Sequence, residues 1–69
     1  MTAEEWNRKY KVGTVIKYYP WLGPNSSAEI SKTRSEAWEL GNGDAVVLIE
    51  GRSGGVALRN VEVLDGKLL

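Results

Sequence analysis

The chain has 69 residues, of which nine are Lys or Arg and nine are Asp or Glu, and it contains neither cysteine nor histidine. The zero net charge excludes a general electrostatic attraction to nucleic acid or to an anionic membrane. No apolar stretch approaches the length of a membrane span, and the N-terminus has no signal-peptide pattern. We therefore expect one cytoplasmic domain over residues 1–69, with no membrane association, no metal and no cofactor.

The N-terminal residues predict a short helix at about residues 3–9. Thr2 and Glu5 have the spacing of a capping box, in which a hydroxyl caps a free backbone amide and a carboxylate three residues later reaches back. Trp6 and Tyr10 are four residues apart and would share one face of the helix. We expect these two rings to pack against the rest of the domain as a lid.

Strand-forming residues follow at positions 12–19 and predict the first strand. Under the two-residue period one face would hold Val12, Thr14, Ile16 and Tyr18. Pro20 ends the strand, because proline cannot donate to a sheet, and a long loop rich in Gly, Pro, Asn and Ser fills positions 21–28. Between residues 30 and 40 only 37–40 is convincing as a strand, and a bulge or helical turn near Arg34 would explain the change of register.

The second half alternates apolar runs with glycine-rich turns. The Asn-Gly pair within residues 41–44 predicts a hairpin, and residues 51–55 predict another turn. Between them, the unbroken apolar run of the strand predicted at 45–50 suggests that both of its faces are covered, one by the core and the other by the N-terminal helix or a partner. The last two strands are predicted at 56–58 and 61–64.

The spacing of these elements resembles that of Src-homology-3 (SH3) domains. The most specific segment is GVALRNVE at residues 55–62, which is similar to the closing segment of that family. The resemblance implies a mainly β fold, a small five-stranded antiparallel SH3-like barrel over about residues 12–64. Leu58 and Val61 stand where the family's peptide pocket has a proline and a tyrosine, so binding of proline-rich peptides is not expected.

Longer segments at residues 12–20, 33–41 and 46–58 carry a second resemblance. They look like small uncharacterised proteins of bacteriophages, prophages and plasmids. This resemblance implies a mobile genetic element as the setting and again a barrel, and it carries no activity.

We predict a non-enzymatic module for binding or assembly, which contacts a protein partner or a second copy of itself. Aromatic side chains commonly dominate the energetics of interfaces, and the candidate contact residues are Tyr18, Tyr19, Trp21 and Trp38. In an alternative arrangement Tyr18 and Trp38 belong to the core, and only the other two are exposed. The apolar run at 46–49 and the zero net charge favour a homodimer.

Nucleic-acid binding is the alternative function. Positive charges alternate with aromatic rings near the N-terminus, as in proteins that bind single strands, and the candidate residues are Arg8, Lys9, Lys11 and Lys17. Glu4 and Glu5 oppose this interpretation, because they add negative charge to the same segment.

A third hypothesis is enzymatic. The plasmid-borne, trimethoprim-resistant dihydrofolate reductases are small barrels that build one active pore from four chains. Their pore strand carries a glutamine and a tyrosine that residues 56–59 of this chain lack. Without histidine or cysteine a general base would have to be a lysine or a carboxylate, and Asp44, Glu50 and Glu62 fall at predicted turns or strand ends. We therefore predict that the protein is not an enzyme.

Overall fold

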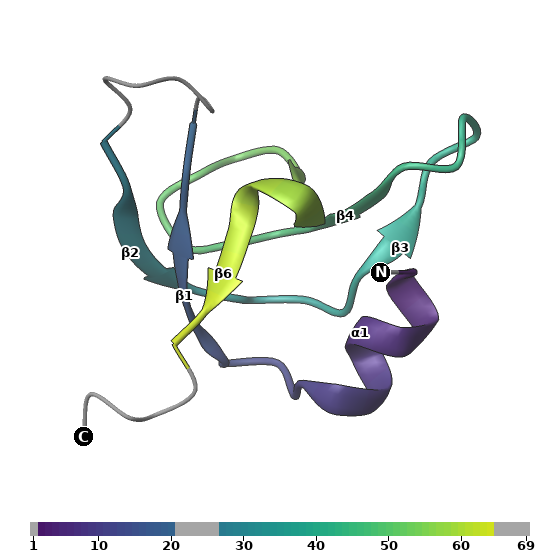
Figure 1. Ribbon diagram of the computed structural model, residues 1–69, viewed down its shortest axis with the longest axis horizontal. Helices are drawn as coiled ribbons and strands as arrows, with labels where there is room; N and C mark the ends of the chain where they lie inside the picture. The colour runs from purple at the N-terminus through teal and green to yellow at the C-terminus, as the bar shows by residue number, and fades with distance from the viewer. Residues whose placement is uncertain (1, 21–26, 65–69) are drawn as a thin grey trace.

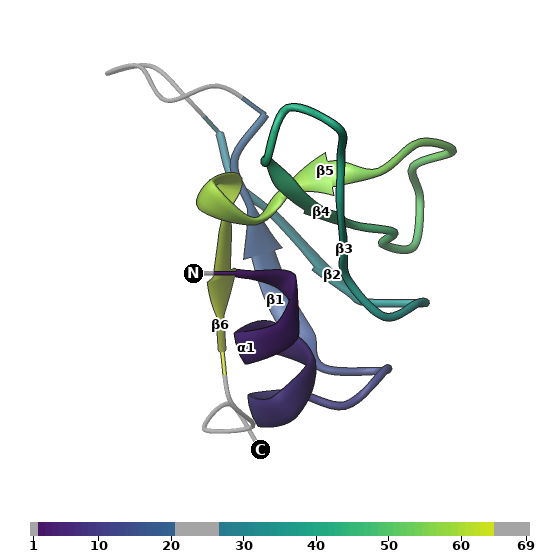
Figure 2. The ribbon, with the colours of Figure 1, turned by 90° about the vertical axis from the view of Figure 1, so that its right-hand side faces the viewer.

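Two three-stranded antiparallel sheets and one short helix make up the part of the chain that the structure, a computed structural model, describes, which is residues 2–20 and 27–64. One sheet has the strand order β2-β1-β6 and the other β3-β4-β5 (Figures 1 and 2). The elements are α1 (Ala3–Lys9), β1 (Val15–Tyr18), β2 (Glu29–Lys32), β3 (Trp38–Glu39), β4 (Ala45–Val47), β5 (Val56–Ala57), the 3-10 turn η1 (Leu58–Asn60) and β6 (Val61–Val63). The prediction of a mainly β fold with one short helix is confirmed. The described residues form six strands, where five were predicted, and the two sheets do not close into a barrel.

The predicted helix and its capping box are confirmed. The backbone N–H of Glu5 donates to the Thr2 hydroxyl at 3.1 Å, and the Thr2 N–H donates to the Glu5 carboxylate at 3.0 Å. The helix ends at Tyr10, whose backbone is extended. Trp6 is 4% exposed and belongs to the core, and the Tyr10 ring lies 4.6 Å from it between centroids. The two rings therefore cover the core as expected.

Asn7 fixes α1 beside the second sheet. Its side-chain amide donates to the carbonyl of Ala37 at 2.9 Å, and its side-chain oxygen accepts from the Ala37 N–H at 2.8 Å. This pair of hydrogen bonds imitates a neighbouring strand and satisfies both backbone groups of Ala37, which is buried. The helix is thereby attached next to β3, the following strand.

The first strand is shorter than predicted. Gly13 has a φ of 100°, and its N–H donates to both the carbonyl and the hydroxyl of Thr33, so the chain turns there before β1 begins at Val15. Val12, predicted to share one face with Ile16 and Tyr18, lies before this turn and is 56% exposed. Ile16 is fully buried, and Tyr18 packs against the core from the same face.

β2 is a strand that the sequence pattern did not predict. It pairs antiparallel with β1 from Val15↔Lys32 to Tyr18↔Glu29. Its burial does not alternate, and its apolar residue Ile30 is 61% exposed. β2 is an edge strand held by the backbone ladder of β1, and such a strand needs no buried apolar face to form.

A bulge separates β2 from β3. The chain advances five residues from Thr33 to Trp38, but only three from Val46 to Ile49 on the opposite strand, with which they pair. The two extra residues lie within 34–37, at the predicted change of register. Arg34 fills the interrupted ladder with its N–H on Leu48 O (2.9 Å) and its guanidinium on Ile49 O (3.0 Å).

The hairpin predicted at residues 41–44 is confirmed. Leu40 N–H donates to Asp44 O at 2.8 Å, and Gly43 supplies the positive φ of 91° that the turn requires. β5 ends at Ala57, one residue before the predicted strand end, because Leu58–Asn60 form the turn η1 that brings Leu58 into the core. The last strand follows directly at Val61.

The core lies between the inner faces of the two sheets, with α1 on one side (Figure 2). Ile16, Val47 and Ile49 have no exposed area, and Trp6 and Leu58 join them. Among residues 2–20 and 27–64 there is no helix with the length and apolar character needed to cross a membrane.

Candidate protein-binding surface

An uncharged row of side chains crosses the outer face of β3-β4-β5. Trp38 lies directly opposite Val46, and Val46 lies directly opposite Ala57, so the three side chains share one face of the sheet. The next pair, Val47↔Val56, faces the core, whereas Val46 is not part of the core cluster. The row Trp38–Val46–Ala57, here called the Trp38 row, therefore faces away from the core.

Trp38 projects from this face and shields its centre. Trp38 is 41% exposed, whereas Val46 is only 7% exposed. A Cβ placed on Gly55 would lie 3.2 Å from Trp38 Cη2 and 3.2 Å from Val46 Cγ2, so the glycine backbone is in contact with both. The second face of β4 is thus covered by the indole of Trp38 and by Gly55. Of the two covers considered for this face, the helix is wrong, because α1 packs on the core side, and a partner stays a prediction.

Two leucines extend the row along the strands. Leu40 follows Trp38 by two residues and is 44% exposed, and Leu48 follows Val46 by two residues and is half-buried. Together with the row they form an apolar surface, here called the Trp38 face: Trp38, Leu40, Val46, Leu48 and Ala57. Asp44, which lies opposite Leu40 and is paired with Arg59, borders it at the hairpin end. Exposed apolar groups that lie together on one face are typical of contact surfaces.

Of the predicted contact residues that the structure describes, Trp38 lies on a different sheet from Tyr18 and Tyr19. Trp38 is on the outer face of one sheet, and its placement in the core, which the alternative arrangement required, is wrong. Tyr18 packs against the core from the other sheet, with the Arg52 guanidinium 5.0 Å from its ring centroid. Trp21 lies outside the described residues.

Tyr19 interacts with the last strand. Its hydroxyl donates to the Glu62 carboxylate at 2.8 Å, and this hydrogen bond raises the pKa of the Tyr19 phenol above its usual range. Asn60 donates from its side chain to the Tyr19 carbonyl at 2.9 Å. These contacts attach Tyr19 to η1 and to β6, so the residue has a structural role on this sheet.

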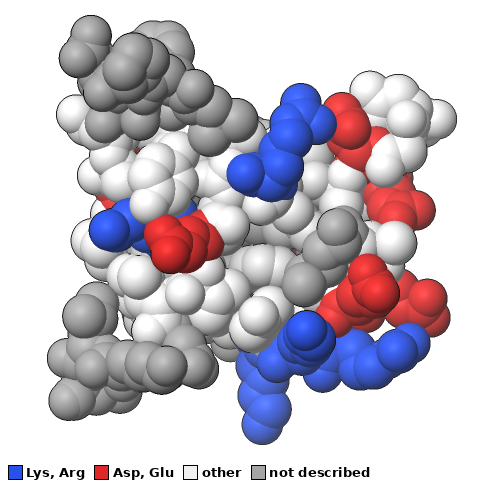
Figure 3. Space-filling view, viewed as in Figure 1, with Lys and Arg blue, Asp and Glu red and all other residues white. Residues whose placement is uncertain are grey.

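The candidate nucleic-acid residues are divided among α1, the turn that follows it, where the Lys11 carbonyl accepts from the Thr14 N–H, and β1. Arg8 and Lys9 lie in the last turn of α1, and Arg8 is 3.7 Å from the carboxylate of Glu4. Lys17 is on β1, directly opposite Glu62 of β6. In the view of Figure 3 each group of Lys and Arg side chains has Asp or Glu side chains beside it, so this face carries no continuous basic surface.

Each of the three candidate general bases is paired with a different residue. Asp44 is 3.3 Å from Arg59, Glu50 is 3.8 Å from Lys32, and Glu62 accepts from Tyr19. Residues 56–59 form a two-residue strand and the start of a 3-10 turn. In the described part of the chain no three His, Cys, Asp or Glu side chains are grouped so that they could hold a metal ion.

Sequence reasoning did not find the Trp38 row, although one signal pointed to part of it. In a hairpin closed by Leu40 and Asp44, the residues two positions further from the turn on each strand are Trp38 and Val46, and they must lie opposite each other. The pairing of Val46 with Ala57 depends on the length of the second turn, which the sequence does not determine.

No family model, curated protein or solved structure matches this chain. The resemblance to small proteins of phages and plasmids therefore stays a prediction.

Proposed function

We propose that the protein is a non-enzymatic assembly module, a small SH3-like barrel that is open between its two sheets and binds a second copy of itself through the Trp38 face. The observation that carries this proposal is the Trp38 row, which is uncharged and decreases in side-chain size across the sheet from Trp38 through Val46 to Ala57.

The strand order supports the SH3-like part of the proposal. β1 lies between β2 and the last strand, and a 3-10 turn immediately precedes that last strand. The six strands reduce to five if β2 and β3 are the two halves of one strand bent at the bulge, since Thr33 between them still pairs with Ile49.

The graded row favours a second copy as the partner. A two-fold axis between the two copies, parallel to β4 and passing over Val46, would place Trp38 of each copy over Ala57 of the other, so that the largest side chain meets the smallest. The row contains no charge that would lose its hydration on contact. A chain of this size also has a marginal core, and it has no cysteine to stabilise it, so buried area gained by association stabilises the fold.

The test is the solution mass of the full chain by light scattering and sedimentation over a range of concentrations. We expect a dimer whose dissociation constant rises at least about tenfold in Trp38→Ala, because buried Trp residues are frequent hot spots of interfaces. Ile30→Ala is the matched control, since Ile30 is an exposed apolar residue of the other sheet, and it should leave the dimer unchanged. Wild-type protein that is monomeric throughout, or a Trp38→Ala dimer of unchanged strength, would overturn the proposal.

A double variant tests the two-fold arrangement itself. Trp38→Ala combined with Ala57→Trp moves the large side chain to the other end of the row, and we expect it to restore part of the association that Trp38→Ala loses. Circular dichroism establishes that both variants fold. If the wild-type protein is a monomer that gains mass with single-stranded oligonucleotides at low salt, the nucleic-acid alternative replaces this proposal.

A further inference from the structure

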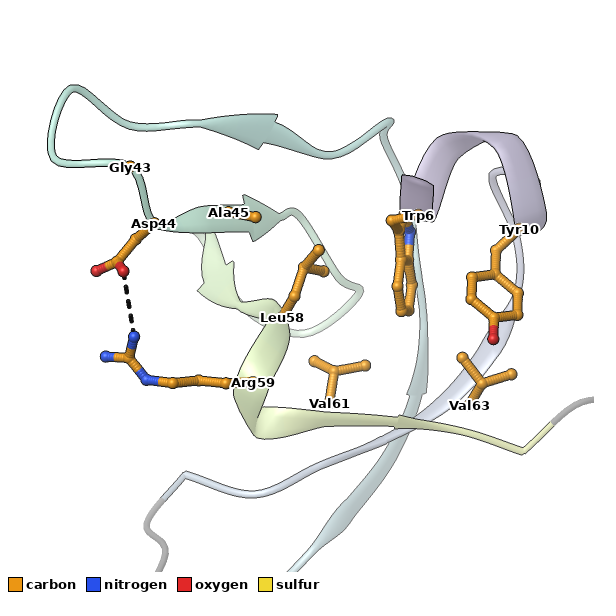
Figure 4. Close-up of a pocket in the computed structure, with 9 residues that line it drawn as sticks. All are labelled: Trp6, Tyr10, Gly43, Asp44, Ala45, Leu58, Arg59, Val61 and Val63. Carbon is orange, nitrogen blue, oxygen red and sulfur yellow. Dashed lines mark hydrogen bonds and ion pairs between the residues drawn. The ribbon is translucent and has the colours of Figure 1, made fainter. Parts of the chain in front are cut away.

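A cleft of about 490 Å³ lies between α1, the start of β4 and the segment η1–β6. Figure 4 shows Leu58, Val61 and Val63 directed from η1 and β6 toward Trp6 and Tyr10 of the helix segment. The cleft lies on the core side of β4, away from the Trp38 row. The proposed self-assembly through the Trp38 face therefore does not cover the apolar wall of the cleft.

One end of the cleft is aromatic and apolar. The rings of Trp6 and Tyr10 form its wall, with centroids 4.6 Å apart and planes inclined by 55°. Trp6 and Leu58 are 4% and 8% exposed, so they are fixed by packing and form the floor of the cleft, and the accessible apolar area belongs mainly to the half-buried Tyr10, Val61 and Val63. The wall is therefore already formed, and binding an apolar group there requires no large rearrangement.

The other end carries one ion pair. Arg59 Nη1 lies 3.3 Å from Asp44 Oδ1 (Figure 4), and the second oxygen of Asp44 is 3.4 Å from the side-chain nitrogen of Asn42. Both oxygens of Asp44 thus already have a donor. A guanidinium has five N–H donors, and the bond to Asp44 is the one side-chain hydrogen bond of Arg59 within the described residues. Because the Arg59 side chain is 68% exposed, its other donors can be reached from solvent.

We propose that this cleft binds a small amphipathic carboxylate, with the apolar part against Tyr10 and the two valines of β6 and the carboxylate on Arg59. The volume lies within the range of small-molecule sites, which combine an apolar wall with a few polar groups. A carboxylate can use the remaining donors of Arg59 without breaking the ion pair. An ammonium ion would have to compete with Arg59 for Asp44 and would be repelled by it.

The experiment is an NMR titration of the ¹⁵N-labelled full chain with three probes of the same shape, 3-phenylpropionate, 3-phenylpropanol and 3-phenylpropylamine. We expect the Trp6 indole N–H and the Ala45 amide to shift, and the carboxylate to bind about two- to fivefold more tightly than the alcohol, the range expected for an exposed ion pair. The amine should bind most weakly.

Arg59→Gln should remove the preference for the carboxylate and leave binding of the alcohol unchanged. Arg8→Gln is the matched control, because Arg8 is a similarly exposed arginine in an ion pair outside the cleft. Equal affinity for all three probes, an unchanged preference in Arg59→Gln, or shifts confined to residues outside the cleft would overturn the proposal. Repeating the titration in Trp38→Ala separates this result from the state of assembly.

Discussion

The two sheets bury their inner faces in one core, but their outer faces differ at the centre. On β2-β1-β6, Lys17 lies directly between Ile30 and Glu62. On β3-β4-β5, Val46 lies directly between Trp38 and Ala57. Each row has three residues and crosses its sheet through the middle strand, so the comparison is between a charged centre and an apolar one.

The difference shows that exposure of a single apolar residue does not identify a contact surface. Ile30 is 61% exposed and Trp38 only 41%, so exposure alone would rank Ile30 first. Ile30, however, lies beside a lysine that must remain hydrated, whereas Trp38 continues into uncharged neighbours. The central strand of each sheet is therefore more informative than its edge.

The largest expected effect is the difference in unfolding free energy between substitutions on the inner and the outer face of β2-β1-β6. Ile16→Ala should lower the free energy of unfolding by about 2–5 kcal/mol, because Ile16 is fully buried and its truncation leaves a cavity. Ile30→Ala, the same substitution on the outer face, should change it by less than about 0.5 kcal/mol. Urea unfolding followed by far-UV circular dichroism measures both. Similar losses in the two variants would mean that the outer face of this sheet is also covered.

A smaller effect compares the two central residues directly. Val46→Thr should lower the free energy of unfolding by about 1–3 kcal/mol, because it places a hydroxyl beneath the Trp38 indole. Lys17→Thr should lie within about 0.5 kcal/mol of wild type, since its face is solvated. The same urea titrations decide the matter, and a Val46→Thr variant as stable as Lys17→Thr would show that the Trp38 row is hydrated.

The sequence predicted the features that depend on neighbouring residues. The capping box of Thr2 and Glu5 and the Asn-Gly hairpin each involve a few consecutive residues, and local hydrogen bonds determine both. The bulge near Arg34 was also recognisable, because the apolar pattern changes register there. Such features do not depend on how distant segments meet.

The features that were missed depend on pairing between distant segments. β2 forms because its backbone pairs with that of β1, and nothing in its own residue pattern indicates a strand. The turn at Leu58 replaces the predicted strand end because the chain must enter the core before β6 begins. The Trp38 row needs the register of β4 with β5, which no local rule determines. The sequence therefore predicted two parts of the candidate surface, Trp38 and the apolar run at 46–49, but not that they lie side by side.

The smallest expected effect is a difference between the two sheets in their response to acid, which arises because α1 is attached to only one of them. The hydrogen bond from the Thr2 backbone holds the pKa of the Glu5 carboxyl below its usual range. Because the folded-state pKa is the lower one, the capping box stabilises α1 above the unfolded-state pKa, and this contribution is lost as the pH falls through the folded-state pKa. Since Asn7 attaches α1 to Ala37, the amide of Ala37 should shift on acidification more than that of Ser31 in β2.

Amide spectra recorded from neutral to acid pH measure this difference, and Glu5→Gln is the matched variant. Glutamine can also serve in a capping box and does not titrate between these pH values, so the shift at Ala37 should largely disappear in this variant. Equal shifts at Ala37 and Ser31 would mean that acid loosens both sheets together and that the helix is not attached preferentially to β3-β4-β5. A larger shift at Ala37 that persists in Glu5→Gln would assign the acid response to another carboxylate near β3, of which Glu36 and Glu39 are the nearest in sequence.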